Sequence, residues 1–407
     1  MNNSKGKKKR DLSRQKVRQI LSITNAINNN LEASALFKLF KEILVSNLEI
    51  EHVVFFAKID NTWKLPIHVD VANAITNINV DTDLLRYKDI TSLGMVNNKL
   101  LDFFDLIIPI IQDDKPLGYL LLKDIEDDAN GVSNLIKNLN YIQSLANIIM
   151  VAIENKRMVN EQINQAALKR DLILAERIQE ALLPATLPSN ERIKATAFHQ
   201  SRGHVGGDYY DLIETRDGIY YFCVADVSGK GISAAMLMSN FQAAFKATIR
   251  QNIPIQEVII ELNKIVFESS LGDKFITAFI GKYDSHNREL EYINCAHPPA
   301  ILFNHLTTLT LDADIPGLGM LTQLPRIEPE TYTLIPGTFL TTYTDGISEI
   351  ENEQGEQFGI DRIIECINTF KGKPLEEFIP HFNTNIEVFI GQRDPDDDIA
   401  ALNIEFL

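Results

Sequence analysis

At 407 residues the chain is longer than a single ordinary hydrophobic core, so its length favours two domains. Its 45% hydrophobic and 23% charged residues are typical of a soluble globular protein, and no apolar run is long enough to span a bilayer, so we expect a cytoplasmic protein without stable membrane insertion. The formal net charge of −16 disfavours nucleic acid as a partner, because such binding depends on Lys and Arg that neutralise phosphates.

Residues 1–14 are the exception to this acidic balance, since they contain the run Lys7-Lys8-Lys9-Arg10. A cluster of like charges is typical of a disordered, solvated tail. We therefore expect residues 1–14 to be disordered, and transient contact with a membrane surface is the alternative role of this cluster.

The next segment combines helical and strand patterns. Apolar residues recur at helical spacing from residue 12 to residue 48, with an interruption at Asn28-Asn29-Asn30, which predicts two helices. Residues 53–59, 106–111 and 118–122 have strand character, and the last two pair across the turn Asp113-Asp114-Lys115-Pro116. A sheet with helices at both ends resembles a GAF sensory domain over residues 15–155. The resemblance implies a site for a small-molecule or protein effector, or a dimerisation scaffold without ligand.

Residues 132–184 predict a long helix that overlaps the end of this domain, because neither Gly nor Pro occurs between Val132 and Leu183. A narrow apolar stripe follows a coiled-coil spacing along it: Leu135, Leu139, Ile142, Ala146, Ile149 and Ile153, then Ile163, Ala167, Leu174, Ile178 and Leu182. Such a helix needs a partner. We expect a homodimer through this coiled coil; the alternative is that the stripe packs on the chain's own C-terminal domain.

Residues 185–407 show a second pattern of strands and helices. Strands are expected at residues 193–198, on both sides of the turn Arg216-Asp217-Gly218, and near residues 275–284, 290–294, 300–303, 338–343 and 399–406. Helices are expected at residues 233–250, with Ser233 as its cap, and at residues 255–269, 361–369 and 375–390. This order predicts an α+β domain.

Acidic residues stand at the strand ends of this domain. Asp208 follows Gly206-Gly207, and Asp226 ends the strand across the hairpin, while Asp345 and Asp397 occupy strand boundaries far downstream. Glycine beside an aspartate lets the backbone come close to a bound ion. Carboxylates that share a cleft stay ionised only when cations compensate them, so the pattern predicts a Mg²⁺ or Mn²⁺ site. Ser228-Gly229-Lys230-Gly231 does not have the Walker spacing of a nucleotide phosphate loop.

The three cysteines, Cys223, Cys295 and Cys366, are widely spaced in apolar or helical surroundings. This suits reduced core residues better than a disulfide or a zinc site.

From about Leu174 to Leu407 the ordered motifs resemble the SpoIIE/RsbU type of serine phosphatase, a bacterial branch of the metal-dependent 2C-type (PPM) family. The motifs that carry the resemblance are residues 175–184, Gly206–Asp211, Asp226–Gly231, Phe275–Phe279, Asn294–Pro299, Tyr343–Glu349 and Asp397–Ile399. The resemblance implies an αββα sandwich, joined by the coiled-coil helix to the GAF-like domain.

It also implies two divalent ions, Mn²⁺ or Mg²⁺. Asp208 and Asp226 would act through a metal-bound water, and the Val227 carbonyl, Asp345 and Asp397 would complete the ligands; Asp398 is the alternative to Asp397.

Two positions depart from the family wording. Ala400 stands where Thr is usual, and His297 lies in a motif that is one residue shorter than usual. Ala400 could loosen the surroundings of the ligands, and His297 could be a proton donor or a structural residue.

The resemblance implies hydrolysis of phosphoserine or phosphothreonine on a STAS-domain anti-sigma-factor antagonist or a similar partner-switching protein, gated by the N-terminal domain. The alternatives are a catalytically weak or inactive interaction scaffold of the same fold, and a different metal-dependent output such as a nucleotide cyclase.

Overall fold

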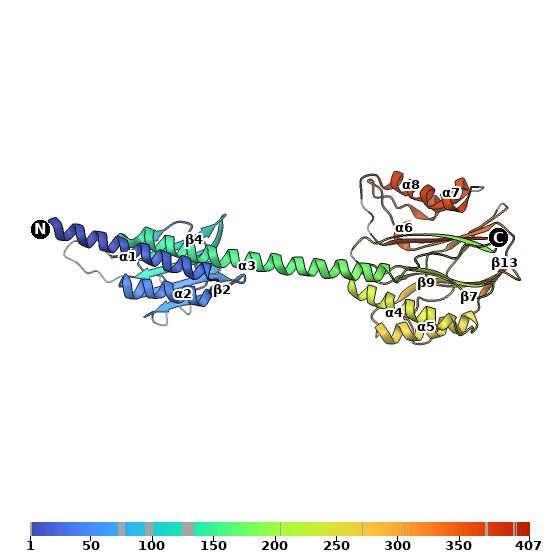
Figure 1. The fold of residues 1–407 in the computed structure, drawn as a ribbon, viewed down its shortest axis with the longest axis horizontal. Helices are drawn as coiled ribbons and strands as arrows, with labels where there is room; N and C mark the ends of the chain where they lie inside the picture. Colours follow the sequence, from blue (N-terminus) through green and yellow to red (C-terminus); the bar gives the residue numbers. More distant parts are fainter. Residues whose placement is uncertain are drawn as a thin grey trace. The chain divides into compact units, whose positions relative to one another are not determined.

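The computed structural model describes residues 2–71, 78–93, 101–123, 134–203, 205–270, 272–304, 306–370, 373–393, 395 and 397–407. The chain forms two compact units, Met1–Ala167 and Leu168–Leu407, and the boundary falls within a long helix. Each unit is described by itself (Figure 1). Across the described ranges, no helix has both the length and the apolar character that crossing a bilayer requires.

The first unit is a five-stranded antiparallel sheet of order β2-β1-β5-β4-β3 with helices on one face. Its elements are α1 (Asn2–Asn28), α2 (Ala33–Glu42), η1 (Ile43–Asn47), β1 (His52–Ile59), β2 (Thr62–Val69), η3 (Val80–Leu84), β3 (Thr91–Ser92), β4 (Leu106–Gln112), β5 (Lys115–Lys123) and α3 (Asn134–Glu180).

Successive side chains of β1 point to opposite faces of the sheet and so belong to two different hydrophobic cores of this unit. Val53, Phe55 and Ala57 face α1, α2 and the first part of α3. Val54 and Phe56 face the opposite core, which includes residues of η3. The predicted pairing of residues 106–111 with 118–122 is confirmed as the β4–β5 hairpin.

Two expectations for the helices are wrong. Residues 2–14 belong to α1 rather than to a disordered tail; Arg, Lys and Gln are good helix formers, and the segment continues a helix that packs on the sheet further along.

The first half of the apolar stripe in α3 is also not free for a second chain. Ile142, Ala146 and Ile149 are fully buried in the core of the first unit. Residues 132 and 133 lie outside the described residues.

The second unit contains two five-stranded sheets, of order β13-β10-β9-β8-β7 and β12-β11-β14-β15-β6. Its elements after α3 are β6 (Ile193–Gln200), β7 (Tyr209–Arg216), β8 (Ile219–Val227), α4 (Ile232–Ile249), α5 (Ile255–Ser270), β9 (Ile276–Asp284), β10 (Glu289–Cys295), β11 (Ala300–Phe303), β12 (Thr308–Leu311), β13 (Glu330–Thr333), β14 (Thr338–Tyr343), α6 (Asp345–Ser348), α7 (Gly359–Phe370), η5 (Leu375–Glu377), α8 (Phe378–Ile390) and β15 (Ile399–Phe406).

The layers of this unit follow the order helices, sheet, sheet, helices, with a hydrophobic core between each two neighbouring layers. On β8, Phe222 and Val224 face the second sheet, whereas Cys223 and Ala225 face α4 and α5. On the second sheet, residues of β11, β14 and β15 face α7 and α8, which cover its outer side in Figure 1. The predicted αββα arrangement is therefore confirmed.

Local details differ from the expectations. Helix α4 begins at Ile232 behind Gly231, whose φ is +81°, and no side chain caps it, so Ser233 is not the cap. The short elements β12, β13 and α6 were not predicted, because segments of four residues carry almost no periodicity. All three cysteines are described, buried and without disulfides, as expected.

Candidate metal centre

Four predicted ligands lie at one end of the two sheets. Asp208 directly precedes β7 and Asp226 is the second-last residue of β8, and these strands pair with Tyr209 opposite Ala225. Asp345 directly follows Thr344 at the end of β14, and Asp397 lies just before β15, with Tyr343 opposite Ala401. Hairpin pairing in one sheet and strand pairing in the other therefore bring residues distant in sequence to one edge of the domain.

Asp208 and Asp226 form the inner pair of this cluster. Asp208 is only 2% exposed, and burial followed by the neighbouring Asp226 charge raises its pKa well above the ordinary value. Burial and the charge of Asp345 raise the pKa of Asp226 to about 7. Both shifts report carboxylates that repel one another in a poorly solvated place, which is the electrostatic condition that a cation relieves.

Asp345 and Asp397 form the outer pair. Burial and then the charge of Asp397 raise the pKa of Asp345. Asp397 Oδ1 accepts a hydrogen bond from the Asp398 amide at 2.9 Å, and its Oδ2 lies 2.8 Å from Lys230 Nζ. Lys230 is thus a cation at the rim of an acidic cluster.

Glycines allow the segments to approach one another. A Cβ on Gly207 would lie 3.0 Å from the Val227 carbonyl oxygen and 3.2 Å from Asp226 Oδ1. A Cβ on Gly346 would lie 1.9 Å from the Asp398 carbonyl oxygen, a distance that no side chain can adopt. Residue 346 must therefore be glycine for the cluster to close, and a side chain at residue 207 would crowd the Val227 carbonyl.

Asp398, the alternative to Asp397, has a different environment. Its carboxylate accepts hydrogen bonds from the Arg202 amide at 2.8 Å and from the Gly207 amide at 2.9 Å. These bonds connect the start of β15 to the loop that carries Asp208. They favour a structural role for Asp398, although its charge, like that of Asp397, acts on Asp226.

Gln179 has a role that sequence reasoning missed. This buried residue near the end of α3 donates to the Gly206 carbonyl at 2.6 Å and accepts from the Gly206 amide at 2.9 Å. It therefore ties α3 to the loop before Asp208. The available signal was the motif of residues 175–184, whose chemistry gave no reason to single out the glutamine.

His297 is a structural residue in this geometry. It is 3% exposed, its Nδ1 lies 2.9 Å from Thr277 Oγ1, and its amide donates to Asn294 Oδ1. Burial lowers its pKa to about 3, so the ring is neutral at physiological pH and is not an imidazolium that could act as a general acid. Thr277 lies opposite Asp226 across β8 and β9, which places the histidine behind the cluster.

The donor set suits a hard divalent ion. Within the ranges that the structure describes, no group of three or more His, Cys, Asp or Glu side chains is placed so that it could hold a metal ion. Mg²⁺ keeps several waters and is commonly held by only one or two carboxylates. The carboxylates of Asp208, Asp226 and Asp345, whose pKa values burial raises, are oxygen donors of the kind that Mg²⁺ or Mn²⁺ prefers.

Sequence comparisons show which known proteins the chain resembles. Residues 216–407 match the family described as Stage II sporulation protein E (SpoIIE). The chain is 26% identical over 204 residues to phosphoserine phosphatase RsbU of Bacillus subtilis (strain 168), which covers 49% of this chain and 61% of RsbU. It is 26% identical over 186 residues to phosphoserine phosphatase RsbP of the same bacterium, which covers 44% of this chain and 46% of RsbP. The chain thus spans less than two thirds of the length of these relatives.

Among solved structures, the SiaA-PP2C domain of Pseudomonas aeruginosa superposes with a TM-score of 0.53 at 23% identity. The superposition covers 60% of this chain and 99% of that domain, and it shows the fold. Residues 216–407 are thus similar to the SpoIIE family, and the second unit has the α+β fold of a PP2C domain.

Proposed function

We propose that this chain is a metal-dependent protein phosphatase that hydrolyses phosphoserine or phosphothreonine. The observation that carries the proposal is the convergence of Asp208, Asp226, Asp345 and Asp397 at one edge of a SpoIIE-family domain. The names of RsbU and RsbP as phosphoserine phosphatases support the reaction type.

In this proposal the carboxylates of Asp208, Asp226, Asp345 and Asp397 and the carbonyl of Val227 hold two Mn²⁺ or Mg²⁺ ions. Such ions, when bound, lower the pKa of a coordinated water and neutralise phosphoryl oxygens. Asp208 and Asp226 carry the catalytic role through this centre. A cysteine nucleophile is not needed, and Cys223 and Cys295 are unsuited to it, because burial raises the pKa of both thiols.

The test is hydrolysis of a phosphoserine peptide by the full chain with Mn²⁺, with Mg²⁺ and with EDTA. We expect turnover that EDTA abolishes and that Asp345→Asn reduces at least about a thousandfold, the scale of losing a main electrostatic contribution. Asp361→Asn is the matched control, since it removes the same charge from the exposed start of α7. A wild-type chain that binds Mn²⁺ but releases no phosphate would support the interaction scaffold instead.

We further propose that the substrate is a phosphorylated STAS-domain protein of a partner-switching pathway, on the basis of the resemblance to the SpoIIE/RsbU type. Release of phosphate from such a protein, compared with a phosphoserine peptide of the same local sequence, tests this. Equal kcat/KM for protein and peptide would contradict recognition of a folded STAS domain.

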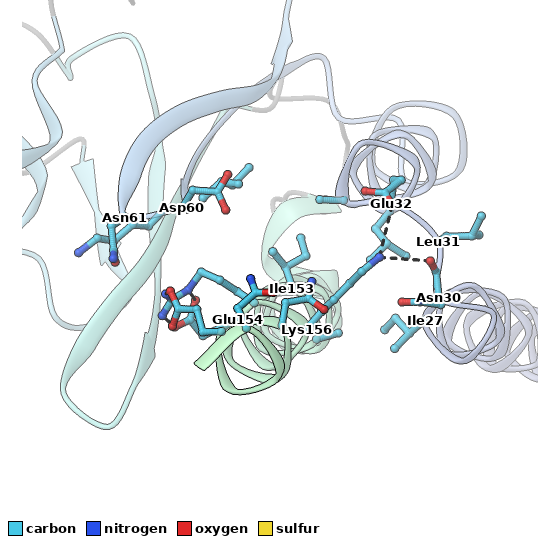
Figure 2. Close-up of a pocket in the computed structure, with 18 residues that line it drawn as sticks. Ile27, Asn30, Leu31, Glu32, Asp60, Asn61, Ile153, Glu154 and Lys156 are labelled. Atoms are coloured by element: carbon cyan, nitrogen blue, oxygen red, sulfur yellow. Dashed lines mark hydrogen bonds and ion pairs between the residues drawn. The ribbon is translucent and has the colours of Figure 1, made fainter. Parts of the chain in front are cut away.

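We propose that the first unit is a GAF-like sensory domain that gates the phosphatase. Support comes from its antiparallel sheet with helices on one face, and from a hollow of about 500 Å³ between α1, α2, the β1–β2 turn and α3. Figure 2 shows Lys156 of α3 reaching Glu32 and the Asn30 carbonyl across this hollow, with distances of 3.5 and 3.3 Å. Apolar Ile27 and Ile153 share the lining with these polar groups, a mixture that suits a small amphipathic effector.

Thermal shift measurements of the full chain against a set of small metabolites test this hollow. A compound that binds here should raise the melting temperature of the wild type but not of Asn160→Trp, whose indole would occupy the hollow that Asn160 lines. An equal rise in both proteins would place the compound elsewhere.

A further inference from the structure

Lys230 pairs with Asp397, one of the proposed metal ligands. Its Nζ lies 2.8 Å from Asp397 Oδ2. Its positive charge also acts on Asp345, where it opposes the rise in pKa that burial and the Asp397 charge cause. The Lys230 and Asp397 side chains are 58% and 39% exposed, so the pair is in contact with water. An ion pair of this kind is weak and is readily exchanged for a stronger partner.

The loop that carries Lys230 is held by hydrogen bonds at Ser228, and a glycine lies on each side of the lysine. Ser228 is held by three bonds: its amide donates to the Phe275 carbonyl, its hydroxyl accepts from the Phe275 amide, and its carbonyl accepts from Lys274 Nζ at 2.8 Å. Gly229 and Gly231 on either side of Lys230 both have φ of +81°, a conformation that glycine adopts without strain. The ammonium group thus sits on a flexible four-carbon stem above a firmly held base.

A hollow of about 330 Å³ adjoins this lysine. Arg202 and Lys230 supply positive charge to its lining, Asp397 and Asp398 lie beside them, and Leu172 and Ile232 contribute apolar surface. The hollow therefore offers cations for a phosphoryl group directly next to the carboxylates that are proposed to hold the metal.

We propose that Lys230 exchanges partners during binding: it competes with a divalent ion for Asp397 and, once displaced, its ammonium group binds the phosphoryl group of the substrate. The second half of this proposal rests on the proposed phosphatase function. Lysine is suited to it, because an ammonium on a mobile stem pairs with either a carboxylate or a phosphate as a point charge.

Two binding measurements on the full chain test the exchange without using turnover. By calorimetry, Lys230→Met should bind Mn²⁺ about 2- to 5-fold more tightly than the wild type, because a competing exposed ion pair is gone. In saturating Mg²⁺, the same variant should bind inorganic phosphate about tenfold more weakly, because a charge-assisted hydrogen bond is lost. Lys230→Arg keeps the charge and should stay near the wild type in both measurements.

Lys282→Met is the matched control, since Lys282 also pairs with a carboxylate, Glu291, at 3.1 Å, but on β9 and β10. It should change neither affinity. Unchanged or weaker Mn²⁺ binding by Lys230→Met would overturn the competition, and unchanged phosphate binding would overturn the substrate role. Because neither readout depends on hydrolysis, a chain inactive on phosphopeptides that still showed both shifts would refute the phosphatase proposal and the substrate role of Lys230, and would leave the competition for Asp397 standing.

Discussion

Thr344 connects the Asp208 carboxylate to strand β15. Its buried hydroxyl donates to Asp208 Oδ2 at 2.7 Å and accepts from the Ala400 amide at 2.9 Å, while its own amide donates to the Ala400 carbonyl. Residue 400 thus contributes its backbone to this contact. The hydrogen bond that orients the Asp208 carboxylate comes from the Thr344 hydroxyl. Asp208 is therefore oriented even though residue 400 is alanine and has no hydroxyl.

Thr344→Val should lower the free energy of unfolding by about 1–3 kcal/mol and weaken Mn²⁺ binding, because a buried carboxylate oxygen and a buried amide lose their partner. Thr344→Ser retains the hydroxyl and should preserve Mn²⁺ affinity. Urea unfolding and calorimetry measure the two effects. Valine and serine variants with the same Mn²⁺ affinity would show that this hydroxyl does not orient Asp208.

Asp226→Asn should abolish metal-dependent turnover without destabilising the metal-free protein. Burial and then repulsion from neighbouring carboxylates raise the pKa of Asp226 to about 7, and removing one charge relieves that repulsion, which also acts on Asp208. Thermal unfolding in EDTA should give a melting temperature equal to or above that of the wild type. Asp398→Asn gives the contrast: it should destabilise the fold, because Asp398 accepts two backbone amides. Near-normal turnover by Asp226→Asn would refute the ligand assignment.

Helix α3 presents its apolar stripe to two environments. Ile142 and Ile149 are buried in the core of the first unit, whereas Ile163, Leu174 and Ile178 are each more than half exposed. An exposed stripe at coiled-coil spacing favours association with a second helix. The proposed dimer contact is therefore the second half of the stripe.

Replacing Ile163 and Leu174 by Lys should weaken self-association at micromolar concentration and leave the fold intact, because those side chains are already solvated. Replacing Ile142 by Lys should instead lower the free energy of unfolding by more than about 3 kcal/mol, since it buries a charge. Light scattering and urea unfolding separate the two outcomes. A monomeric wild type would refute the dimer.

At the scale of the whole molecule, hydrogen bonds at the end of α3 link it to the loop before Asp208 and to α4. Gln179 near its end holds Gly206 in the loop before Asp208, and the Leu182 carbonyl accepts a hydrogen bond from Gln242 of α4. We therefore expect a change in the pairing of α3 to act on the proposed metal ligands through these hydrogen bonds. Linkage then requires an effector that raises Mn²⁺ affinity to bind more tightly when Mn²⁺ is present.

The Mn²⁺ concentration for half-maximal activity should consequently differ between the full chain and the fragment of residues 168–407. Circular dichroism establishes that the fragment is folded before the comparison. Identical half-maximal concentrations and identical turnover would show that the first unit does not gate the enzyme through its metal site.

Several features could be predicted from local sequence. The β-branched and aromatic residues at 219–225 predicted a buried strand, and β8 confirms it, because such side chains pack well on a buried pleated sheet. The glycines beside Asp208 and Asp345 indicated close backbone approach, which Gly207 and Gly346 show. The order of the acidic motifs indicated the family before any contact was known.

The sequence by itself therefore determined the α+β class of the second unit and the set of acidic residues at its strand ends. Tertiary structure alone decided which of two adjacent aspartates bonds to backbone amides, which half of α3 is buried, and that Gln179 and Thr344 support the Asp208 loop. The physical reason is separation along the chain: these contacts join residues 27, 136 and 191 positions apart. Periodicity and turn chemistry report only on residues that are neighbours in sequence. These contacts form only when strands pair within each sheet and the two sheets pack on each other.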